Sequence, residues 1–178
     1  MKPIMSNPKT RSTRTRVAAR IDELLLDHQL CFTLYATSLA MTKVYRPLLA
    51  PLGLTYPQYI VMLALWEHGV LSAGTLGAKV ALDSGTLVPL VRKLTALGVV
   101  ERYRNPADDR SVMISLTPAG RKLSRRARSV NRQIACATQC TDAQIQGLMH
   151  SLKDLRAALL NSAEELLPVV VPPPSPPK

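Results

Sequence analysis

Residues 72–98 read SAGTLGAKVALDSGTLVPLVRKLTALG and contain two helix patterns with a two-residue break between them. Ser72 and Asp83 are residue types that cap helix N-termini, and apolar residues at helical spacing follow each of them. The first helix is predicted to end near Val80. The second is predicted to run from about Asp83 to Leu97, with Gly98 as its stop signal. This second helix has one apolar face, which consists of Leu87, Leu90, Val91, Leu94 and Leu97.

Two predicted strands follow this pair of helices. Residues 99–104 and 111–116 are rich in Val, Ile and other strand-favouring residues, and residues 105–110 between them have turn composition. Two short helices followed by a β-hairpin is the element order of the winged helix-turn-helix. We therefore expect a mainly α fold with a small β-hairpin wing.

Further helices are predicted on both sides of this segment of two short helices and a hairpin. Asp27 is a good N-cap for the first of them, Gly69 closes the second, and Thr141 with Gln144 forms a capping box for the last. The predicted bounds are about 27–49, 56–68, 118–138 and 142–166.

The composition indicates a basic protein built from packed helices. The chain has 178 residues, with 23 Lys and Arg against 12 Asp and Glu, so its net charge is +11. A surplus of this size indicates a polyanionic partner, either nucleic acid or an acidic membrane. Aromatic residues are only 4 % of the chain, which favours helices packed through Leu, Val and Ala. No apolar run approaches the roughly 18 residues of a spanning helix, and no signal peptide is visible, so we expect a cytoplasmic protein without a membrane partner.

The cysteines and histidines do not form a metal-binding pattern. Three cysteines are an odd number, which argues against a disulfide scaffold and leaves room for thiol chemistry. The three histidines lie far apart in sequence and share no ligand spacing with Cys or a carboxylate. We expect neither a metal nor another cofactor.

Both ends of the chain differ in composition from the rest. Residues 1–20 carry six Lys and Arg and no acid, which predicts a disordered basic arm, either simply solvated or in contact with DNA. Residues 168–178 are proline-rich and cannot be helical, so an extended tail is expected there.

The second helix of the quoted stretch has the character of a DNA-reading helix, since its non-apolar side is polar and basic. Hydroxyl groups near its start can hydrogen-bond base edges or phosphates, and cations further along can neutralise phosphates. The candidate residues are Ser84, Thr86, Pro89, Arg92 and Lys93.

The predicted hairpin adds a second basic group. Arg102, Arg104 and Arg110 can contact a minor groove or the flanking phosphates. Asp108 and Asp109 would repel DNA if they faced it, so we expect at least one of them to pair with a wing arginine and to fix its direction.

Residues 56–123 resemble the MarR family of dimeric bacterial regulators. Asp108, Arg110, Leu116 and Thr117 match the family's wing signature, and Gly120 follows it. Over residues 28–165 the sequence is similar to the organic hydroperoxide-sensing OhrR-type repressors. Four stretches carry this likeness: LCFTLY at 30–35, YRPLL at 45–49, LGLTYPQY at 52–59 and DSGTLVPL at 83–90.

The resemblance implies a domain over residues 21–167, with a DNA-binding lobe at about 55–118. Helices at about 27–50 and 118–166 would then form the dimerisation region of a homodimer. Pro89 has a matching proline in the family stretch, and we interpret it as a local bend that sets how Ser84 and Thr86 enter the groove.

Cys31 is the candidate sensing residue. It lies in the first turn of the predicted long helix, where the positive end of the helix dipole favours the thiolate that attacks a peroxide. The resemblance implies that Tyr45 and Tyr56 hydrogen-bond this cysteine. Tyr45 follows Cys31 by 14 residues on one helix, an axial rise of about 21 Å, so the two cannot touch within one chain. Both statements agree if Tyr45 comes from a second chain.

The other two cysteines lie near the C-terminus. In OhrR-type proteins with more than one cysteine, a C-terminal cysteine captures the oxidised sensor in a disulfide between subunits. The resemblance thus implies Cys136 as the resolving residue, because it lies inside a predicted helix, with Cys140 as the alternative.

Together these features predict a homodimeric repressor of double-stranded operator DNA, released when an organic hydroperoxide oxidises Cys31. Three alternatives stay open. They are a regulator controlled by a non-covalent phenolic or fatty-acid ligand, a thiol peroxidase, and a basic protein that coats DNA. We expect a sensor and not an enzyme, since no catalytic base beyond Asp27 and His28 lies near Cys31 in sequence.

Overall fold

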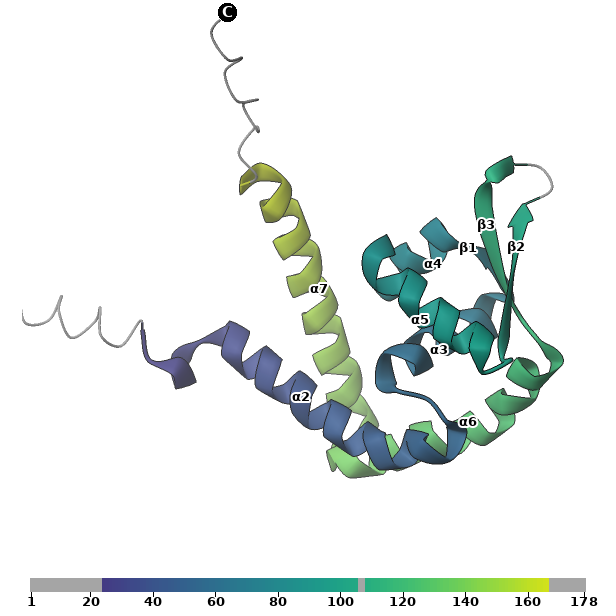
Figure 1. The fold of residues 1–178 in the computed structure, drawn as a ribbon. Helices are drawn as coiled ribbons and strands as arrows, with labels where there is room; N and C mark the ends of the chain where they lie inside the picture. The colour runs from purple at the N-terminus through teal and green to yellow at the C-terminus, as the bar shows by residue number, and fades with distance from the viewer. Residues whose placement is uncertain (1–23, 106–107, 167–178) are drawn as a thin grey trace, which may run out of the picture. The chain divides into compact units, whose positions relative to one another are not determined.

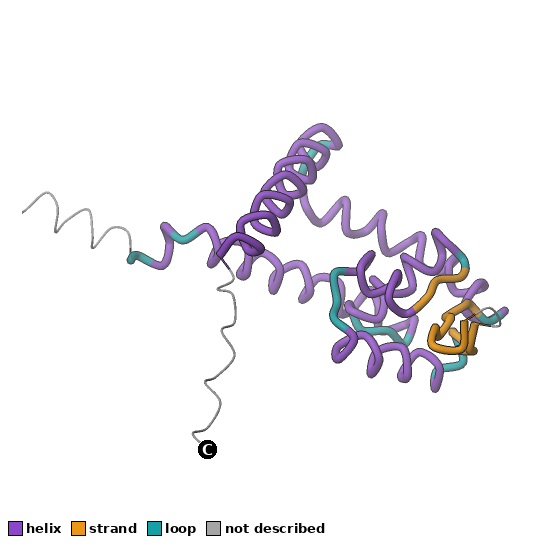
Figure 2. The backbone as a smooth tube through the Cα atoms, turned by 90° about the horizontal axis from the view of Figure 1, so that it is seen from above, coloured by secondary structure: helices purple, strands orange, loops and turns teal. Residues whose placement is uncertain are grey.

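The computed structural model describes residues 24–105 and 108–166, without the side chains of residues 109 and 164–166. The basic arm at 1–20 and the proline-rich tail at 168–178 lie outside the described residues. The described residues divide into two compact units between Ile134 and Ala135. The elements are η1 Leu26–His28, α2 Leu30–Leu49, η2 Ala50–Leu52, α3 Tyr56–His68, β1 Val70–Ser72, α4 Ala73–Val80, α5 Ser84–Ala96, β2 Val100–Asn105, β3 Asp108–Leu116, α6 Pro118–Thr138 and α7 Asp142–Leu166 (Figures 1 and 2).

The first unit is built around α3. Its Tyr59, Val61, Met62 and Leu65 side chains have no exposed surface, because α3 packs against α2, α4, α5 and the sheet. Helices α2, α4, α5 and α6 and the three strands of this unit also contribute buried apolar side chains to the same core. Among them are Leu49, Leu76, Leu87, Val91, Leu94, Val100, Ile114, Ala127 and Val130. The mainly α architecture with a small wing is therefore confirmed.

Local signals set the helix ends of the lobe as the sequence predicts. The Ser72 hydroxyl accepts the Thr75 N–H at 3.1 Å, and the Asp83 carboxylate accepts the Thr86 N–H at 2.9 Å. Gly98 follows α5 with a φ of 69°, a left-handed conformation that glycine adopts without steric cost.

The sheet differs from the predicted hairpin in two ways. It has three antiparallel strands in the order β1-β3-β2, and the short strand β1 pairs Leu71 with Ile114. The sequence pattern missed β1 because three residues are too few to show a strand period. In addition, β3 begins at Asp108, three residues before the predicted start, after a register shift at Arg104 and Asn105.

The start of the long helix was predicted wrongly. Asp27 lies in the short 3-10 helix η1, and the N-cap of α2 is Gln29, whose side chain does not cap the helix. Gln29 has extended backbone angles, φ −89° and ψ 116°, so it separates the two helices. Cys31 is consequently the second residue of α2, still in its first turn.

The start of α6 is tightly joined to α3 and to the turn between α5 and β2. Thr117 Oγ1 donates to the Gly98 carbonyl at 2.6 Å, and Trp66 Nε1 donates to the Gly120 carbonyl at 2.9 Å. A Cβ atom on Gly120 would overlap the carbonyl oxygen of Val99, so only glycine allows this close approach.

The second unit consists of the end of α6 and α7. Thr141 N donates to Gln144 Oε1 at 2.8 Å and Gln144 N donates to Thr141 Oγ1 at 3.3 Å, which confirms the predicted capping box. α7 exposes the large apolar side chains of Leu148, Met149, Leu152, Leu159 and Leu160.

Among the described residues, no single helix is long and apolar enough to span a membrane. The segments Leu30–Leu52 and Tyr56–His68 meet that criterion only as a pair, with a bend of 68° between them.

Candidate DNA-binding surface and thiol site

The first turn of α5 presents the candidate DNA-reading residues. Ser84 and Thr86 are exposed, while Leu87 and Val91 on the opposite side are buried. The Thr86 hydroxyl donates to Asp83 Oδ2 at 2.9 Å, a contact that sequence reasoning missed. The pKa of Asp83 is lowered, first by the backbone N–H of Thr86 and then by this hydroxyl. The Thr86 hydroxyl oxygen can therefore still accept a hydrogen bond from a donor group on a ligand. The Asp83 carboxylate is held beside it.

The remaining candidates on α5 are also exposed. Pro89 lies inside the helix, which continues through it from Ser84 to Ala96. Proline has no N–H, so the Gly85 carbonyl receives no helical hydrogen bond from this position. Arg92 and Lys93 follow on the solvent side. The predicted bend at Pro89 and the roles of these side chains in DNA binding stay predictions.

The wing arginines lie on the two paired strands. Arg102 and Arg104 are exposed on β2 and, two residues apart, project from the same face of the sheet, whereas Arg110 is exposed on β3. Asp108 Oδ1 accepts the backbone N–H of Arg110 at 3.1 Å, which fixes the chain where Arg110 emerges. The side chain of Asp109 lies outside the described residues, so the predicted carboxylate–arginine pair in the wing stays a prediction.

Tyrosine side chains from α2 and α3 form a cluster. The rings of Tyr45 and Tyr56 have centroids 4.5 Å apart, and those of Tyr45 and Tyr59 are 5.8 Å apart. Burial, together with the neighbouring Tyr56 and Tyr59, raises the pKa of Tyr45 from its ordinary 10.0 to about 12. Tyr45 is therefore a neutral hydrogen-bond donor throughout the physiological pH range.

The raised pKa of Tyr45 predicts a loss of stability at high pH. Below pH 10 this tyrosine is neutral in both the folded and the unfolded chain. Between about pH 10 and 12 the unfolded chain ionises first, so stability should fall as the pH rises towards the folded pKa. Thermal unfolding across this range measures the fall, and Tyr45→Phe should reduce it. An equally steep fall in this variant would contradict the assignment of the effect to Tyr45. The pKa of Tyr59 is also raised by burial, so a smaller fall in stability should remain in the variant.

Cys31 is an exposed free thiol near the start of α2. Tyr45 lies on the same unbroken helix, 14 residues further on and about 21 Å along its axis. One chain therefore brings the two predicted pocket tyrosines together but leaves the cysteine far from them.

Cys136 and Cys140 are exposed free thiols of the second unit. Cys136 lies two positions before Thr138, the last residue of α6. Cys140 follows Gln139, which has a left-handed backbone conformation with φ 53°. The Cys140 thiol donates to the Thr138 carbonyl at 3.3 Å, whereas Cys136 has a fixed helical position.

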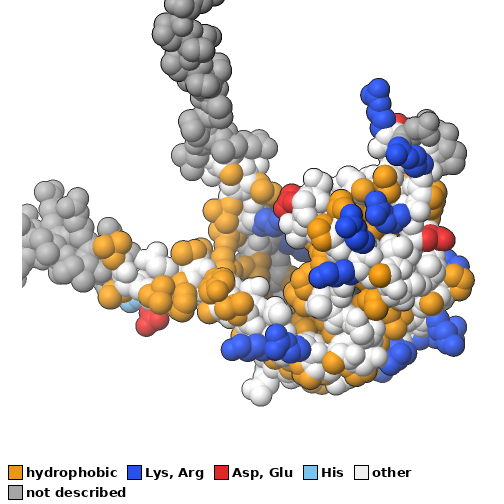
Figure 3. Space-filling view, viewed as in Figure 1, with side chains coloured by type: hydrophobic (Ala, Val, Ile, Leu, Met, Phe, Trp, Pro, Cys, Tyr) orange, Lys and Arg blue, Asp and Glu red, His pale blue; other side chains and the backbone are white. Residues whose placement is uncertain are grey.

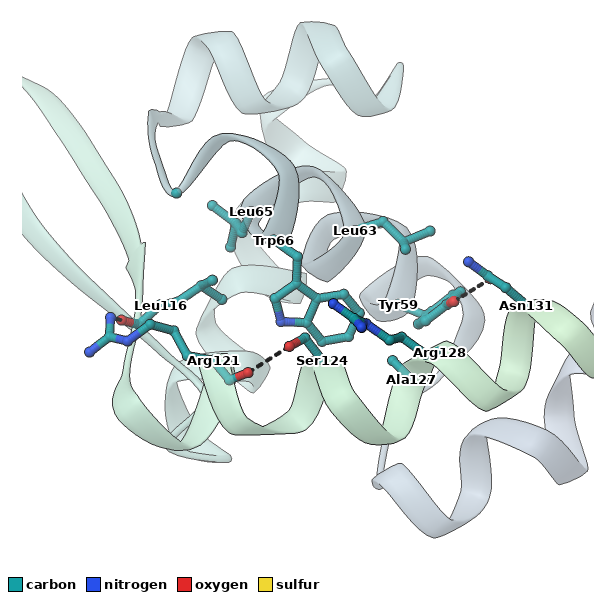
Figure 4. A pocket seen from close by; sticks show the side chains of 11 residues that line it. Tyr59, Leu63, Leu65, Trp66, Leu116, Arg121, Ser124, Ala127, Arg128 and Asn131 are labelled. Carbon is teal, nitrogen blue, oxygen red and sulfur yellow. Dashed lines mark hydrogen bonds between the residues drawn. The ribbon is translucent and has the colours of Figure 1, made fainter.

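A pocket between α3 and α6 was not predicted (Figure 4). It has a volume of about 420 Å³, with Tyr59 and Trp66 of α3 facing Arg128 and Asn131 of α6. Tyr59 Oη donates to Asn131 Oδ1 at 2.7 Å and closes one end. The only sequence signal for it was the spacing of Tyr59, Leu63 and Trp66 on one side of α3, which reads equally as core packing.

Sequence comparison places the chain among known regulators. Residues 43–126 match a family model described as transcriptional regulator SarA/Rot. The organic hydroperoxide resistance transcriptional regulator of Bacillus subtilis (strain 168) is 40 % identical over 147 residues, which are 83 % of this chain and 95 % of that protein. This chain belongs to the OhrR-type branch of the MarR family. The resemblance stated from the sequence is thereby confirmed.

Solved structures of AbfR match most of this MarR-family chain. Reduced AbfR bound to DNA aligns with a TM-score of 0.61 and 26 % identity, covering 85 % of this chain and 99 % of AbfR. Disulfide-formed AbfR aligns with a TM-score of 0.53 and 29 % identity, covering 84 % and 98 %. The AbfR structures thus include both a DNA-bound and a disulfide state.

Proposed function

We propose that this MarR-family chain is a homodimeric repressor that leaves its operator when an organic hydroperoxide oxidises Cys31. One observation carries the proposal: a single helix, α2, bears an exposed thiol in its first turn and, about 21 Å further along, Tyr45, whose ring lies against that of Tyr56 on α3. Neither half can complete a sensing pocket alone. A second copy of α2, running the opposite way, can set Tyr45 and Tyr56 of one chain beside Cys31 of the other.

The sensing step is a two-electron oxidation of sulfur. The Cys31 thiolate attacks the outer peroxide oxygen, the O–O bond breaks, and an alcohol leaves after taking up a proton. Cys31 becomes a sulfenic acid. The thiol of Cys136 in the partner chain then attacks this sulfur, forms the S–S bond and releases water. Tyr45, neutral at physiological pH, and Tyr56 act as hydrogen-bond donors that orient the thiolate before reaction.

Exposed apolar surface supports the dimer. Large apolar side chains lie open on both α2 and α7, and uncovered apolar surface of this extent marks a protein–protein interface. On α2 they are Leu30, Tyr35, Leu39 and Val44. A dimer would also supply two α5 helices for the two half-sites of a palindromic operator, about one DNA turn apart.

DNA release follows from the geometry of disulfide closure. A disulfide needs Cα atoms within about 7 Å, so any larger initial separation of Cys31 and the partner's Cys136 requires the helices to move. Such movement changes the spacing of the two α5 helices. A loss of about 3 kcal/mol in binding free energy lowers operator affinity more than 100-fold. Thiol reductants of the cytoplasm, where we expect the protein to work, reverse the disulfide.

The decisive experiment binds reduced protein to its own upstream DNA and adds an organic hydroperoxide. We expect release of the DNA and a cross-linked dimer on a non-reducing gel. Cys136→Ser should lose the cross-link, while Cys140→Ser, the matched control four residues away, should keep it. Release without a cross-linked dimer would overturn the Cys136 step. Peroxide consumption should stop near one molecule per subunit, since continued turnover would indicate a thiol peroxidase.

A second candidate function rests on the pocket between α3 and α6. Its aromatic walls and the Arg128 guanidinium suit a phenolic or other carboxylic acid, which would control DNA binding without covalent chemistry. Replacement of Cys31 by serine distinguishes the two functions, because a response to such a ligand would survive it.

A further inference from the structure

Helix α6 is unusually basic. Its 21 residues, Pro118–Thr138, include five arginines and one lysine and no acidic residue. Like charges three or four residues apart on a helix destabilise it by about 0.2–0.5 kcal/mol per pair. Repulsion between these like charges therefore lowers the stability of α6, so helix formation is not the reason for the six cations.

Two of these cations have a structural role. Arg121 Nη1 donates to the Leu116 carbonyl at 2.6 Å, and Arg126 Nη2 donates to the Pro51 carbonyl at 2.8 Å. A third, Arg128, lines the pocket described above. These three side chains are accounted for by the fold and the pocket.

The remaining three cations, Lys122, Arg125 and Arg132, form what we call the basic stripe. All three are exposed, and within the described ranges none has a hydrogen-bond or ion-pair partner. They lie on the side of α6 away from its buried residues Gly120, Ala127 and Val130. The ends of the stripe, Lys122 and Arg132, are ten positions apart on the helix, which corresponds to a length of about 15 Å.

The basic stripe is separated from the DNA-reading surface by the body of the lobe. α3 packs against α5 and hydrogen-bonds α6 through Tyr59 and Trp66, and Figure 1 shows α6 along the lower edge of the lobe with strands β2 and β3 rising away from its start. Packed helix axes are about 8–10 Å apart and α3 lies between, so the first turn of α5 is about 20 Å from the middle of α6, whose start alone meets the turn after α5. Figure 3 shows Lys and Arg side chains near the wing and also along the lower edge of the lobe.

We propose that the basic stripe binds the phosphate backbone of a second DNA duplex, distinct from the operator held by α5. The occupant follows from charge complementarity, because DNA is the polyanion that regulators of this family meet, and three unpaired cations along 15 Å suit one strand of phosphates. The operator-bound dimer would thereby hold two DNA segments together. The proposal depends on DNA binding and not on the redox chemistry of Cys31.

The test uses the full chain in the reduced state, on beads carrying operator DNA in excess so that every α5 is occupied. A labelled non-operator duplex is then added, and its capture is measured. The variant is Lys122→Gln/Arg125→Gln/Arg132→Gln, and the matched control is Lys153→Gln/Arg156→Gln on α7. Glutamine keeps helix propensity and removes only charge, and a thermal melt confirms folding of both variants.

Wild type and the α7 control should capture the second duplex, and the stripe variant should lose capture while its operator Kd changes less than about twofold. Wild-type capture should weaken about 40-fold between 50 and 200 mM salt if three phosphates are neutralised. Undiminished capture by the folded stripe variant would overturn the proposal. An equal loss of operator affinity would do so too, since it would place the stripe on the operator. Selective loss of binding to phosphatidylserine vesicles, with capture unchanged, would assign the stripe to a membrane surface instead.

Discussion

Cys31→Ser should bind operator DNA as tightly as the unchanged chain and remain bound when an organic hydroperoxide is added. The unchanged chain should lose at least about 100-fold in affinity under the same treatment, so this is the largest functional effect that we expect. Serine has nearly the same size as cysteine, and Cys31 is exposed, so the fold should tolerate the exchange. A serine hydroxyl at neutral pH is not a nucleophile towards peroxides, so the first step is absent.

Operator binding before and after peroxide, with reductant as the reset, measures this effect. Cys140→Ser is the control, because Cys140 is also an exposed free thiol and its replacement should leave the response intact. If Cys31→Ser still released DNA on oxidation, the sensor would have to be another residue. If it released DNA only with a phenolic acid, the α3–α6 pocket would be the controlling site.

Gly120→Ala should give the largest loss of stability. The added Cβ would overlap the Val99 carbonyl oxygen, which is backbone and cannot turn aside. Relief requires α6 to move away from Val99, and that movement strains the bonds from Trp66 to Gly120 and from Thr117 to Gly98. Overpacked sites cost about 1–3 kcal/mol and occasionally more, and we expect the upper end here.

Gly147→Ala is the matched control for this substitution. Gly147 lies in α7, and a Cβ there meets no atom within 4 Å. Alanine should therefore stabilise this helix by about 0.5–1 kcal/mol. Chemical denaturation of both variants measures the two changes. A Gly120→Ala protein as stable as wild type would show that α6 can move away from Val99 without loss of stability.

The sequence predicted the lobe well where a residue type acts locally. Tyr56–His68 was predicted to the residue because Pro57 suits a first turn and Gly69 a stop. Ser72 and Asp83 marked α4 and α5 because their side-chain oxygens accept backbone N–H groups a few residues away. Such signals depend on neighbours in sequence and need no tertiary information.

The errors arose where tertiary contacts decide. Strand β1 exists because β3 offers it a pairing edge, and three residues carry no period of their own. Helix α2 begins after Gln29 and not after Asp27, although Asp27 is the better N-cap residue. The bond from Thr86 to Asp83 and the pocket beside Trp66 depend on side-chain directions that composition does not give.

The candidate sensing site was predictable only in part. Cys31, Tyr45 and Tyr56 were identified from a resemblance, and the about 21 Å between Cys31 and Tyr45 followed from helix geometry. The structure adds that the rings of the two tyrosines lie against each other, with centroids 4.5 Å apart, at a distance from the thiol.

The separation of thiol and tyrosines along α2 has a genetic consequence in the proposed dimer. Each protomer supplies the cysteine of one sensing pocket and the tyrosines of the other. A chain with Cys31→Ser and a chain with Tyr45→Phe are each defective as homodimers. In a mixed dimer, however, both lesions fall in the same pocket, and the other pocket is wild type. Two defective alleles expressed in one cell would therefore complement each other and restore one working sensor per dimer.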